Sequence, residues 1–156
     1  MEKYKIDEIH CREYLVNGEL KKWEGDTSEV FSTIDIKEEG GYSPTLLGSI
    51  PDMDSDSALE ALESAKKAFN RGQGKWPTMK VRDRLKCMKR FADKMQEHRE
   101  IVVKLLMWEI GKNQTDSEKE FDRTVKYIYD KIDEYKNIDR SSSRFEKDSG
   151  IHAHIR

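Results

Sequence analysis

The sequence predicts a mixed α/β fold, because the spacing of its apolar residues changes along the chain. Up to about residue 50, apolar and polar residues alternate in short runs separated by glycines, which is typical of strands. After Pro51 the apolar residues recur every three or four positions, as they do on one face of a helix. Alternation returns after residue 150. We therefore expect a strand-rich start, three or four helices and a final strand.

Four strands are predicted before Pro51: Glu13–Val16, Glu19–Trp23, Val30–Ile36 and Thr45–Ile50. Asn17-Gly18 separates the first two, and this dipeptide is the strongest short signal of a two-residue hairpin turn. Gly40–Pro44 is expected to break the chain between the last two, because glycine and proline interrupt strands.

The first predicted helix begins at Asp54 or Ser55, whose side chains are of the type that caps helices. Gly72 and Gly74 are expected to end it. Trp76-Pro77 then predicts a connection, because the residue before a proline is pushed out of helical geometry.

The next helical stretch covers Val81–Ile110, which at roughly thirty residues is long for a globular helix. We expect a bend near residues 97–99. Gly111 stands where a left-handed residue would end the helix.

The last predicted helix carries the most regular apolar stripe of the chain, formed by Phe121, Val125, Ile128, Ile132 and Tyr135. Steps of four and three residues place these side chains on one narrow helix face, which needs another surface to cover it. Residues 139–143 are expected to end the helix. The strand that follows is incomplete at Arg156, so we expect this chain to be an amino-terminal piece.

Composition limits the possible partners. Charged residues make up 38% of the chain and the net charge is −2, with acids and bases interspersed, so no basic stripe favours nucleic acid. No apolar run approaches the ~18 residues that cross a bilayer, and the polar start is unlike a signal peptide. We expect a cytoplasmic protein whose two cysteines, Cys11 and Cys87, are reduced.

Four segments, in this order, resemble the aldehyde dehydrogenase superfamily: Leu46–Pro51, Ala65–Phe69, Trp76–Arg84 and Glu109–Lys112. Two further segments, Asp116–Thr124 and Gly150–Arg156, are most similar to the non-phosphorylating, NADP-dependent glyceraldehyde-3-phosphate dehydrogenases. The resemblance implies an enzyme of glycolysis that oxidises D-glyceraldehyde 3-phosphate to 3-phosphoglycerate and reduces NADP to NADPH. A cysteine thiolate would attack the aldehyde, hydride would pass to the nicotinamide, and water would release the acyl group.

The same resemblance implies a domain organisation. Residues 1–53 would form amino-terminal strands, residues 54–139 helices that pack on the nucleotide-binding domain, and residues 140–156 the start of an oligomerisation arm. The catalytic domain, with its cysteine, glutamate and nucleotide loops, would lie outside this chain. We therefore expect the 156-residue piece alone to be inactive, and the full-length enzyme to be a homodimer or homotetramer.

One residue receives a role from the resemblance. Arg123 stands where the glyceraldehyde-3-phosphate members place an arginine that helps bind the substrate phosphate, a task suited to a forked guanidinium. Arg123 lies about 200° around the helix from Phe121, at roughly 100° per residue, so it points away from the apolar stripe. The alternative is a solvated arginine paired with Glu118 or Glu120.

The chain offers few other chemical motifs. Cys87 is neither at a helix start nor beside a histidine, so a packing or surface cysteine is expected rather than a nucleophile. Gly111-Lys112 lacks the first glycine and the hydroxyl residue of a phosphate-binding loop. Gly72–Pro77 lacks the third glycine of a dinucleotide-binding loop. His152 and His154 share a strand face without an evident third ligand, which favours a structural strand over a metal site.

Two other interpretations stay open. The enzyme could act on lactaldehyde or a similar unphosphorylated aldehyde, with Arg123 a surface residue. The chain could instead be a free-standing helical interaction module that binds a partner through the stripe from Phe121 to Tyr135.

Overall fold

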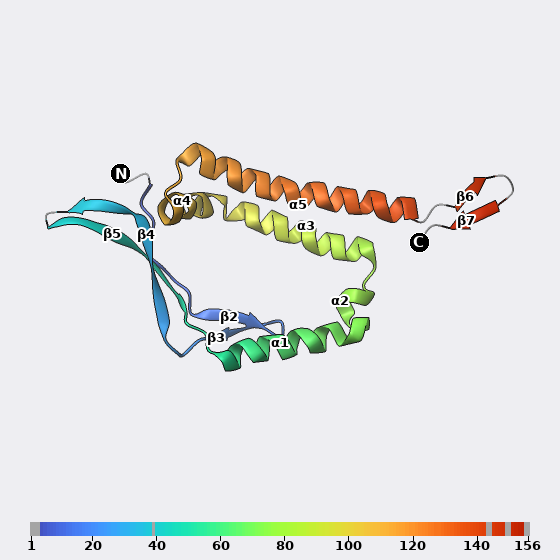
Figure 1. Cartoon of the computed structure of the whole chain (residues 1–156), viewed down its shortest axis with the longest axis horizontal. Coiled ribbons are helices and arrows are strands. Elements are labelled where there is room, and N and C mark those ends of the chain that lie inside the picture. The colour runs from blue at the N-terminus through green and yellow to red at the C-terminus, as the bar shows by residue number, and fades with distance from the viewer. Residues whose placement is uncertain (1–3, 39, 143–144, 149–150, 155–156) are drawn as a thin grey trace. The chain divides into compact units, whose positions relative to one another are not determined.

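The computed structural model has the predicted α/β fold and describes residues 4–38, 40–142, 145–148 and 151–154 (Figure 1). The strands are β1 (Ile9–His10), β2 (Glu13–Val16), β3 (Glu19–Lys22), β4 (Thr27–Glu38), β5 (Gly41–Pro51), β6 (Phe145–Asp148) and β7 (Ile151–His154). The helices are α1 (Ser55–Phe69), the 3₁₀ turn η2 (Asn70–Gly72), α2 (Lys75–Thr78), α3 (Val81–Glu97), α4 (Arg99–Ile110) and α5 (Gln114–Ser142). The chain divides into two compact units, one drawn from Met1–Thr78 and Glu100–Lys119 and the other from Met79–Arg99 and Glu120–Arg156.

The first unit contains a three-stranded sheet with the order β1-β5-β4. The strands β4 and β5 pair antiparallel along most of their length, and β1 adds a short parallel pair at Gly48 and Ser49. The predicted break at Gly40–Pro44 is wrong for all but its first residue, because β5 already begins at Gly41. Pro44 is tolerated in the strand because it pairs only with Asp35, on the β4 side. A proline without an N–H fits such an edge position.

The predicted hairpin at Asn17-Gly18 is confirmed. The backbone φ angles of these two residues are 55° and 81°, as a type I′ turn requires, and Val16 pairs with Glu19. The hairpin contacts α1: the Asn17 amide donates to Ser64 Oγ at 3.0 Å, and Lys21 Nζ forms an ion pair with Glu60.

Asp54 caps α1 as predicted, because its side chain accepts a 2.8 Å hydrogen bond from the Ser57 amide. The predicted end of this helix is wrong: α1 ends at Phe69, and Asn70 takes the left-handed conformation. The predicted Trp76-Pro77 connection contains the single helical turn α2. Pro77 fits there because the first turn of a helix has no internal partners for its N–H groups.

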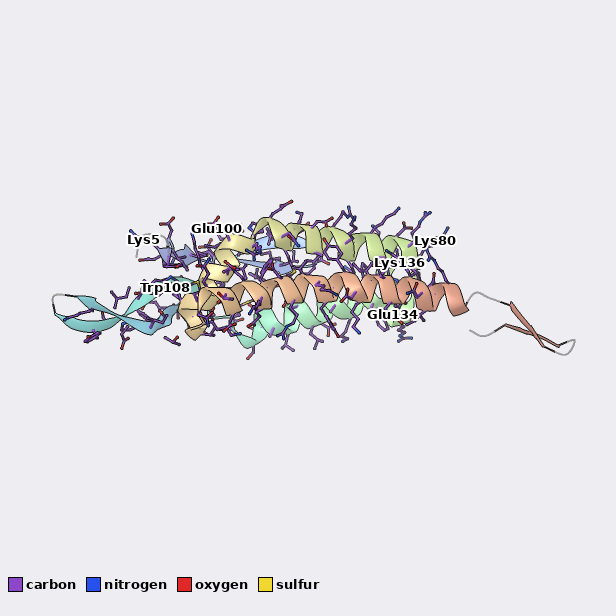
Figure 2. All side chains as sticks on the ribbon, turned by 90° about the horizontal axis from the view of Figure 1, so that it is seen from above. Lys5, Lys80, Glu100, Trp108, Glu134 and Lys136 are labelled. Atoms are coloured by element: carbon purple, nitrogen blue, oxygen red, sulfur yellow. The ribbon has the colours of Figure 1, made fainter. Side chains whose placement is uncertain are left out.

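The expected bend in the long helical stretch is confirmed at His98, which separates α3 from α4. In the first unit, Trp108 joins α4 to distant parts of the chain (Figure 2). Its indole Nε1 donates to the Tyr4 carbonyl at 2.7 Å, and its own carbonyl accepts from Ser32 Oγ at 2.7 Å. Gly111 follows α4 with a φ of 69°, as its predicted role as a left-handed cap requires.

The helices of the second unit are α3 and the part of α5 from Glu120 onward, which lie side by side (Figure 1). Its buried apolar residues are Ala92 on α3 and Phe121, Val125 and Ile132 on α5. Tyr129 Oη donates to Asp93 Oδ1 at 2.5 Å and so joins the two helices. Three members of the predicted stripe are therefore buried, whereas Tyr135 at its end is 43% exposed.

The final strand is confirmed as β7, and it pairs antiparallel with β6. The strand β6 and the two-residue β1 are not predicted from the sequence. The helix α5 ends at Ser142, within the predicted range of residues 139–143. Among the helices in the described ranges, none combines the length and apolar character that crossing a membrane demands.

We predict that Gly48→Ala separates β1 from β5. A Cβ atom at Gly48 would lie 1.9 Å from the Ile9 carbonyl oxygen, and the φ of Gly48 is 146°, a value that residues with a side chain rarely adopt. The amide of Cys11, which bonds to the Ser49 carbonyl at 2.8 Å, should lose its protection from hydrogen exchange. The control Gly40→Ala meets open space and should leave the exchange rate unchanged. Retained protection in Gly48→Ala would contradict the close approach of β1 to Gly48.

We predict that Val125→Ala lowers the free energy of unfolding by about 2 kcal/mol, from the lost transfer energy of two methyl groups and the cavity they leave. Val125 is only 1% exposed. Urea denaturation followed by circular dichroism measures the loss. The matched substitution Val81→Ala, at a half-buried position of α3, should cost clearly less. Equal losses at the two positions would show that Val125 is not a core residue.

Candidate functional site

The helix α5 presents Arg123 on its polar side. Phe121 and Val125, two positions before and after it, are 4% and 1% exposed, and Arg123 itself is exposed. The orientation expected from helical geometry is therefore confirmed: the guanidinium lies away from the buried stripe.

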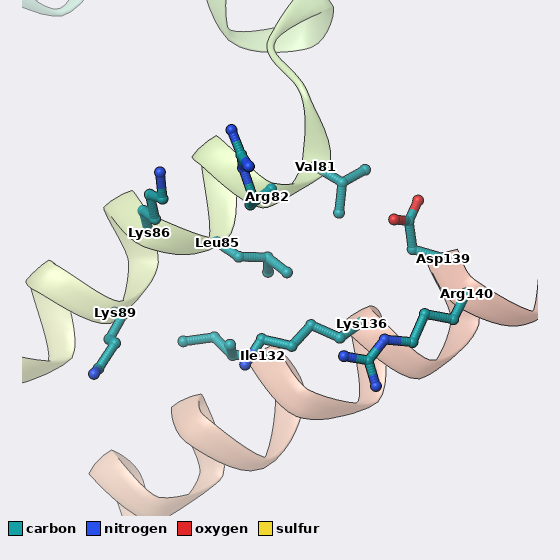
Figure 3. A pocket seen from close by; sticks show the side chains of 9 residues that line it. All are labelled: Val81, Arg82, Leu85, Lys86, Lys89, Ile132, Lys136, Asp139 and Arg140. Atoms are coloured by element: carbon teal, nitrogen blue, oxygen red, sulfur yellow. The ribbon is translucent and has the colours of Figure 1, made fainter.

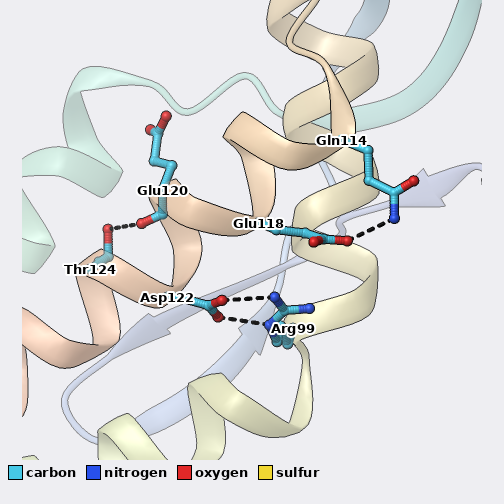
Figure 4. Close-up of polar contacts among 6 residues, drawn as sticks. All are labelled: Arg99, Gln114, Glu118, Glu120, Asp122 and Thr124. Atoms are coloured by element: carbon cyan, nitrogen blue, oxygen red, sulfur yellow. Dashed lines mark hydrogen bonds and ion pairs between the residues drawn. The ribbon is translucent and has the colours of Figure 1, made fainter.

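Arg123 is not held by the acids that the alternative interpretation offered. Glu118 accepts a 2.7 Å hydrogen bond from Gln114 Nε2 instead (Figure 4). The backbone carbonyl of Glu120 accepts from Thr124 Oγ1 at 2.9 Å. Within the residues that the structure describes, Arg123 forms no hydrogen bond or ion pair.

The neighbouring carboxylate is committed elsewhere. Arg99 Nε and Nη2 donate to the two carboxylate oxygens of Asp122 at 2.8 and 2.9 Å, a bidentate pair (Figure 4). The hydrogen bonds from Arg99 hold the pKa of the Asp122 carboxyl below its ordinary value, against a smaller opposing effect of desolvation. Asp122 therefore stays ionised, with its charge balanced by Arg99.

This arrangement can bind an anion but supplies no reaction chemistry of its own. An exposed guanidinium has five N–H donors and a permanent positive charge, and its fork matches the oxygens of a phosphate or carboxylate. No nucleophile or general base accompanies Arg123 among its described neighbours in sequence: Asp122 pairs with Arg99, and the Thr124 hydroxyl donates to the Glu120 carbonyl of the same helix. Arg123 can position a substrate that other residues transform.

The cysteines do not form a catalytic group. Cys87 is half-buried within α3, and Arg90 Nη2 approaches its Sγ at 3.3 Å. Cys11 is exposed in the first unit. Both thiols are free, as expected. A thiol inside a helix without an adjacent base lacks the usual setting of a nucleophile.

No described group of three His, Cys, Asp or Glu side chains could hold a metal ion. His152 and His154 belong to β7, as the structural interpretation requires, but their side chains lie outside the described part of the molecule.

The two glycine-containing segments lie in connections. Gly111-Lys112 links α4 to α5, and residues 72–77 run from η2 into α2. Both segments follow helical elements, whereas the turn that holds a dinucleotide pyrophosphate follows a strand. These segments therefore do not fit NADP.

Sequence reasoning missed a second set of cations, on α3 and α5. Val81, Leu85, Lys86 and Lys89 of α3 line one pocket with Ile132, Lys136 and Arg140 of α5. The signal was available: Ile132, Lys136 and Arg140 follow one another at intervals of four, which places them on one helix face.

A comparison with known protein families matches most of this chain. Residues 32–154 match the aldehyde dehydrogenase family. A benzaldehyde dehydrogenase, named as mitochondrial, from Antirrhinum majus is 31% identical over 98 residues, which cover 63% of this chain and 17% of that protein. The mitochondrial aldehyde dehydrogenase family 2 member B4 of Arabidopsis thaliana is 26% identical over 105 residues, covering 67% of this chain and 18% of that protein. No solved structure matched.

The chain thus spans less than a fifth of the length of these curated relatives. The family match nevertheless covers well over half of the chain, and it includes β5, all the α-helices and both strands of the final hairpin. Its strands and helices fit the amino-terminal part of such an enzyme. This chain belongs to the aldehyde dehydrogenase family.

Proposed function

We propose that this chain is part of an enzyme that oxidises D-glyceraldehyde 3-phosphate to 3-phosphoglycerate with NADP, and that Arg123 binds the substrate phosphate. The observation that carries this proposal is the free guanidinium of Arg123, which is exposed and without a hydrogen-bonding partner among the described residues. A phosphate monoester would satisfy this guanidinium through two parallel N–H···O bonds.

The surroundings of Arg123 favour an incoming anion over an internal partner. The nearest carboxylate in sequence, Asp122, is engaged at both oxygens by Arg99. A released carboxylate beside Arg123 would repel a phosphate dianion, whereas a carboxylate balanced by Arg99 repels it less. Arg99 therefore acts as a positioning residue for the site.

The remaining parts of the proposed enzyme come from the rest of the protein. The catalytic cysteine, the general base and the residues that hold NADP would lie beyond these 156 residues, because no segment described above fits those tasks. The preference for NADP over NAD follows only from the family resemblance. We further propose that the full-length enzyme is a homodimer or homotetramer in the cytosol. Both curated relatives are named as mitochondrial, so cell fractionation should test whether the enzyme is in the cytosol or in mitochondria.

A second candidate is an enzyme for an unphosphorylated aldehyde. The name of the Antirrhinum majus relative, benzaldehyde dehydrogenase, favours this class. Arg123 would then be an ordinary solvated arginine, whose removal affects no substrate selectively.

In the full-length enzyme, Arg123→Gln should lower kcat/KM for D-glyceraldehyde 3-phosphate by about tenfold to a hundredfold, because a charge-assisted hydrogen bond contributes about 1.5–3 kcal/mol. The value for unphosphorylated D-glyceraldehyde should stay nearly constant. Arg123→Lys should show an intermediate loss, since lysine keeps the charge but not the fork. Steady-state kinetics with both aldehydes measures the ratio.

Arg140→Gln is the matched control, because it removes another exposed arginine from α5. It should alter neither aldehyde's kinetics. Equal losses on both aldehydes in Arg123→Gln, or none on either, would reject the phosphate-binding role and favour the second candidate.

We predict that Arg99→Gln raises the pKa of Asp122 toward the ordinary value of about 3.9. The folded-state pKa is lowered by Arg99, so the pair stabilises the fold above the ordinary pKa, and this stabilisation is lost as the pH falls through the folded pKa. Carboxyl chemical shifts recorded by NMR across the acid range measure the change. Lys136→Gln, which removes the partner of Asp133, should leave the Asp122 titration unaltered. An unshifted Asp122 in Arg99→Gln would show that the pair does not persist in solution.

A further inference from the structure

The second unit contains a pocket of about 390 Å³ that the phosphate-binding proposal does not use (Figure 3). It lies between α3 and α5, and its volume falls within the range of small-molecule sites, about 300–1,000 Å³. Val81, Leu85 and Ile132 direct their apolar side chains into the space between the two helices (Figure 3). The pocket therefore offers an apolar surface to a ligand body.

Each helix contributes a row of residues spaced by four. The row on α3 is Val81, Leu85 and Lys89, and the row on α5 is Ile132, Lys136 and Arg140. Residues at this spacing share one helix face, so each row passes from apolar to cationic along its helix. In Figure 3 the Lys136 side chain extends back over Ile132, and the Arg140 guanidinium is directed toward Lys136. Lys136 and Arg140 therefore both border the apolar surface.

The charges around the pocket are unbalanced. Its lining has five cationic side chains and one carboxylate, that of Asp139. Asp83 pairs with Arg82 at 3.7 Å and with Lys86 at 3.3 Å, and these two cations point away from α5 (Figure 3).

Asp133 pairs with Lys136 at 2.7 Å. The five cations of the lining carry five positive charges, and the carboxylates of Asp83, Asp133 and Asp139 balance three of them. Two positive charges therefore remain around the pocket. Lys89 and Arg140 form no ion pair within the described part of the chain. The Lys136–Asp133 pair is largely exposed, and exposed pairs add little stability, so Lys136 can turn to another anion at little cost.

We propose that this pocket binds a small organic anion with an apolar body and a carboxylate or phosphate head. The body packs on Val81, Leu85 and Ile132, and the head is held by Arg140 together with Lys136. A head of one or two negative charges matches the two positive charges left around the pocket. An apolar cation is disfavoured by the same field, and an inorganic anion gains nothing from the apolar surface. This site is separate from Arg123 and does not depend on the proposed substrate.

Isothermal titration calorimetry of the complete natural protein tests the proposal, with octanoate as the probe. Octanoate should bind at one site per chain, and octylammonium and acetate should bind at least tenfold more weakly. Arg140→Gln should weaken octanoate binding at least tenfold, and Lys136→Gln should weaken it to a smaller extent. Circular dichroism should show both variants folded, since the two side chains are exposed.

Two matched controls are available in the second unit. Lys94→Gln removes an exposed cation of α3 outside the pocket, and Arg123→Gln removes an exposed arginine of α5 outside it. Neither should change octanoate binding. The proposal would be overturned if octanoate did not bind at all, or if octylammonium bound as tightly as octanoate. It would also be overturned if octanoate binding survived Arg140→Gln or was lost in Arg123→Gln. Because Arg123 does not line this pocket, failure here leaves the phosphate-binding proposal untouched.

Discussion

The apolar stripe of α5 sets the geometry of the second unit. Phe121, Val125 and Ile132 are almost fully excluded from water, and Ala92 of α3 has no exposed surface. Burial of a large aliphatic or aromatic side chain contributes about 1.5–3 kcal/mol, whereas the many exposed ion pairs of this chain contribute little each. Once this stripe is buried, the rotation of α5 is fixed. Arg123 must then lie on the exposed side, and Lys136 and Arg140 must border the space beside α3.

The sequence predicts the parts of the fold that local chemistry decides. The Asn17-Gly18 turn, the Asp54 cap, the bend at His98 and the left-handed Gly111 all follow from the residues at those positions. The elements it misses depend on pairing between segments. Pro44 can belong to β5 because it pairs only with β4 and has no strand on its other side. The strand β1 can pair with β5 because Gly48 has no side chain to block the close approach of Ile9. Such information is not contained in a short stretch of sequence.

The candidate site was predictable only in part. Helical periodicity gives the outward orientation of Arg123, but it does not show which acids are engaged. The structure pairs Asp122 with Arg99, a residue 23 positions earlier, and so leaves Arg123 without a partner among the described residues. The cationic pocket needs two helices to be placed side by side, and the sequence contains only its separate rows. The phosphate-binding role of Arg123 rests on family resemblance and on this free guanidinium, and it stays a prediction.

The most direct test is the substrate preference of the complete natural protein, purified from its host with an antibody raised against this segment. Initial rates of NADPH formation would be measured with D-glyceraldehyde 3-phosphate, D-glyceraldehyde and benzaldehyde. We expect a species much longer than 156 residues that prefers the phosphorylated aldehyde by at least about tenfold in kcat/KM. A preference for benzaldehyde or D-glyceraldehyde, or a protein without dehydrogenase activity, would contradict the phosphate-binding role of Arg123 and the enzyme built around it.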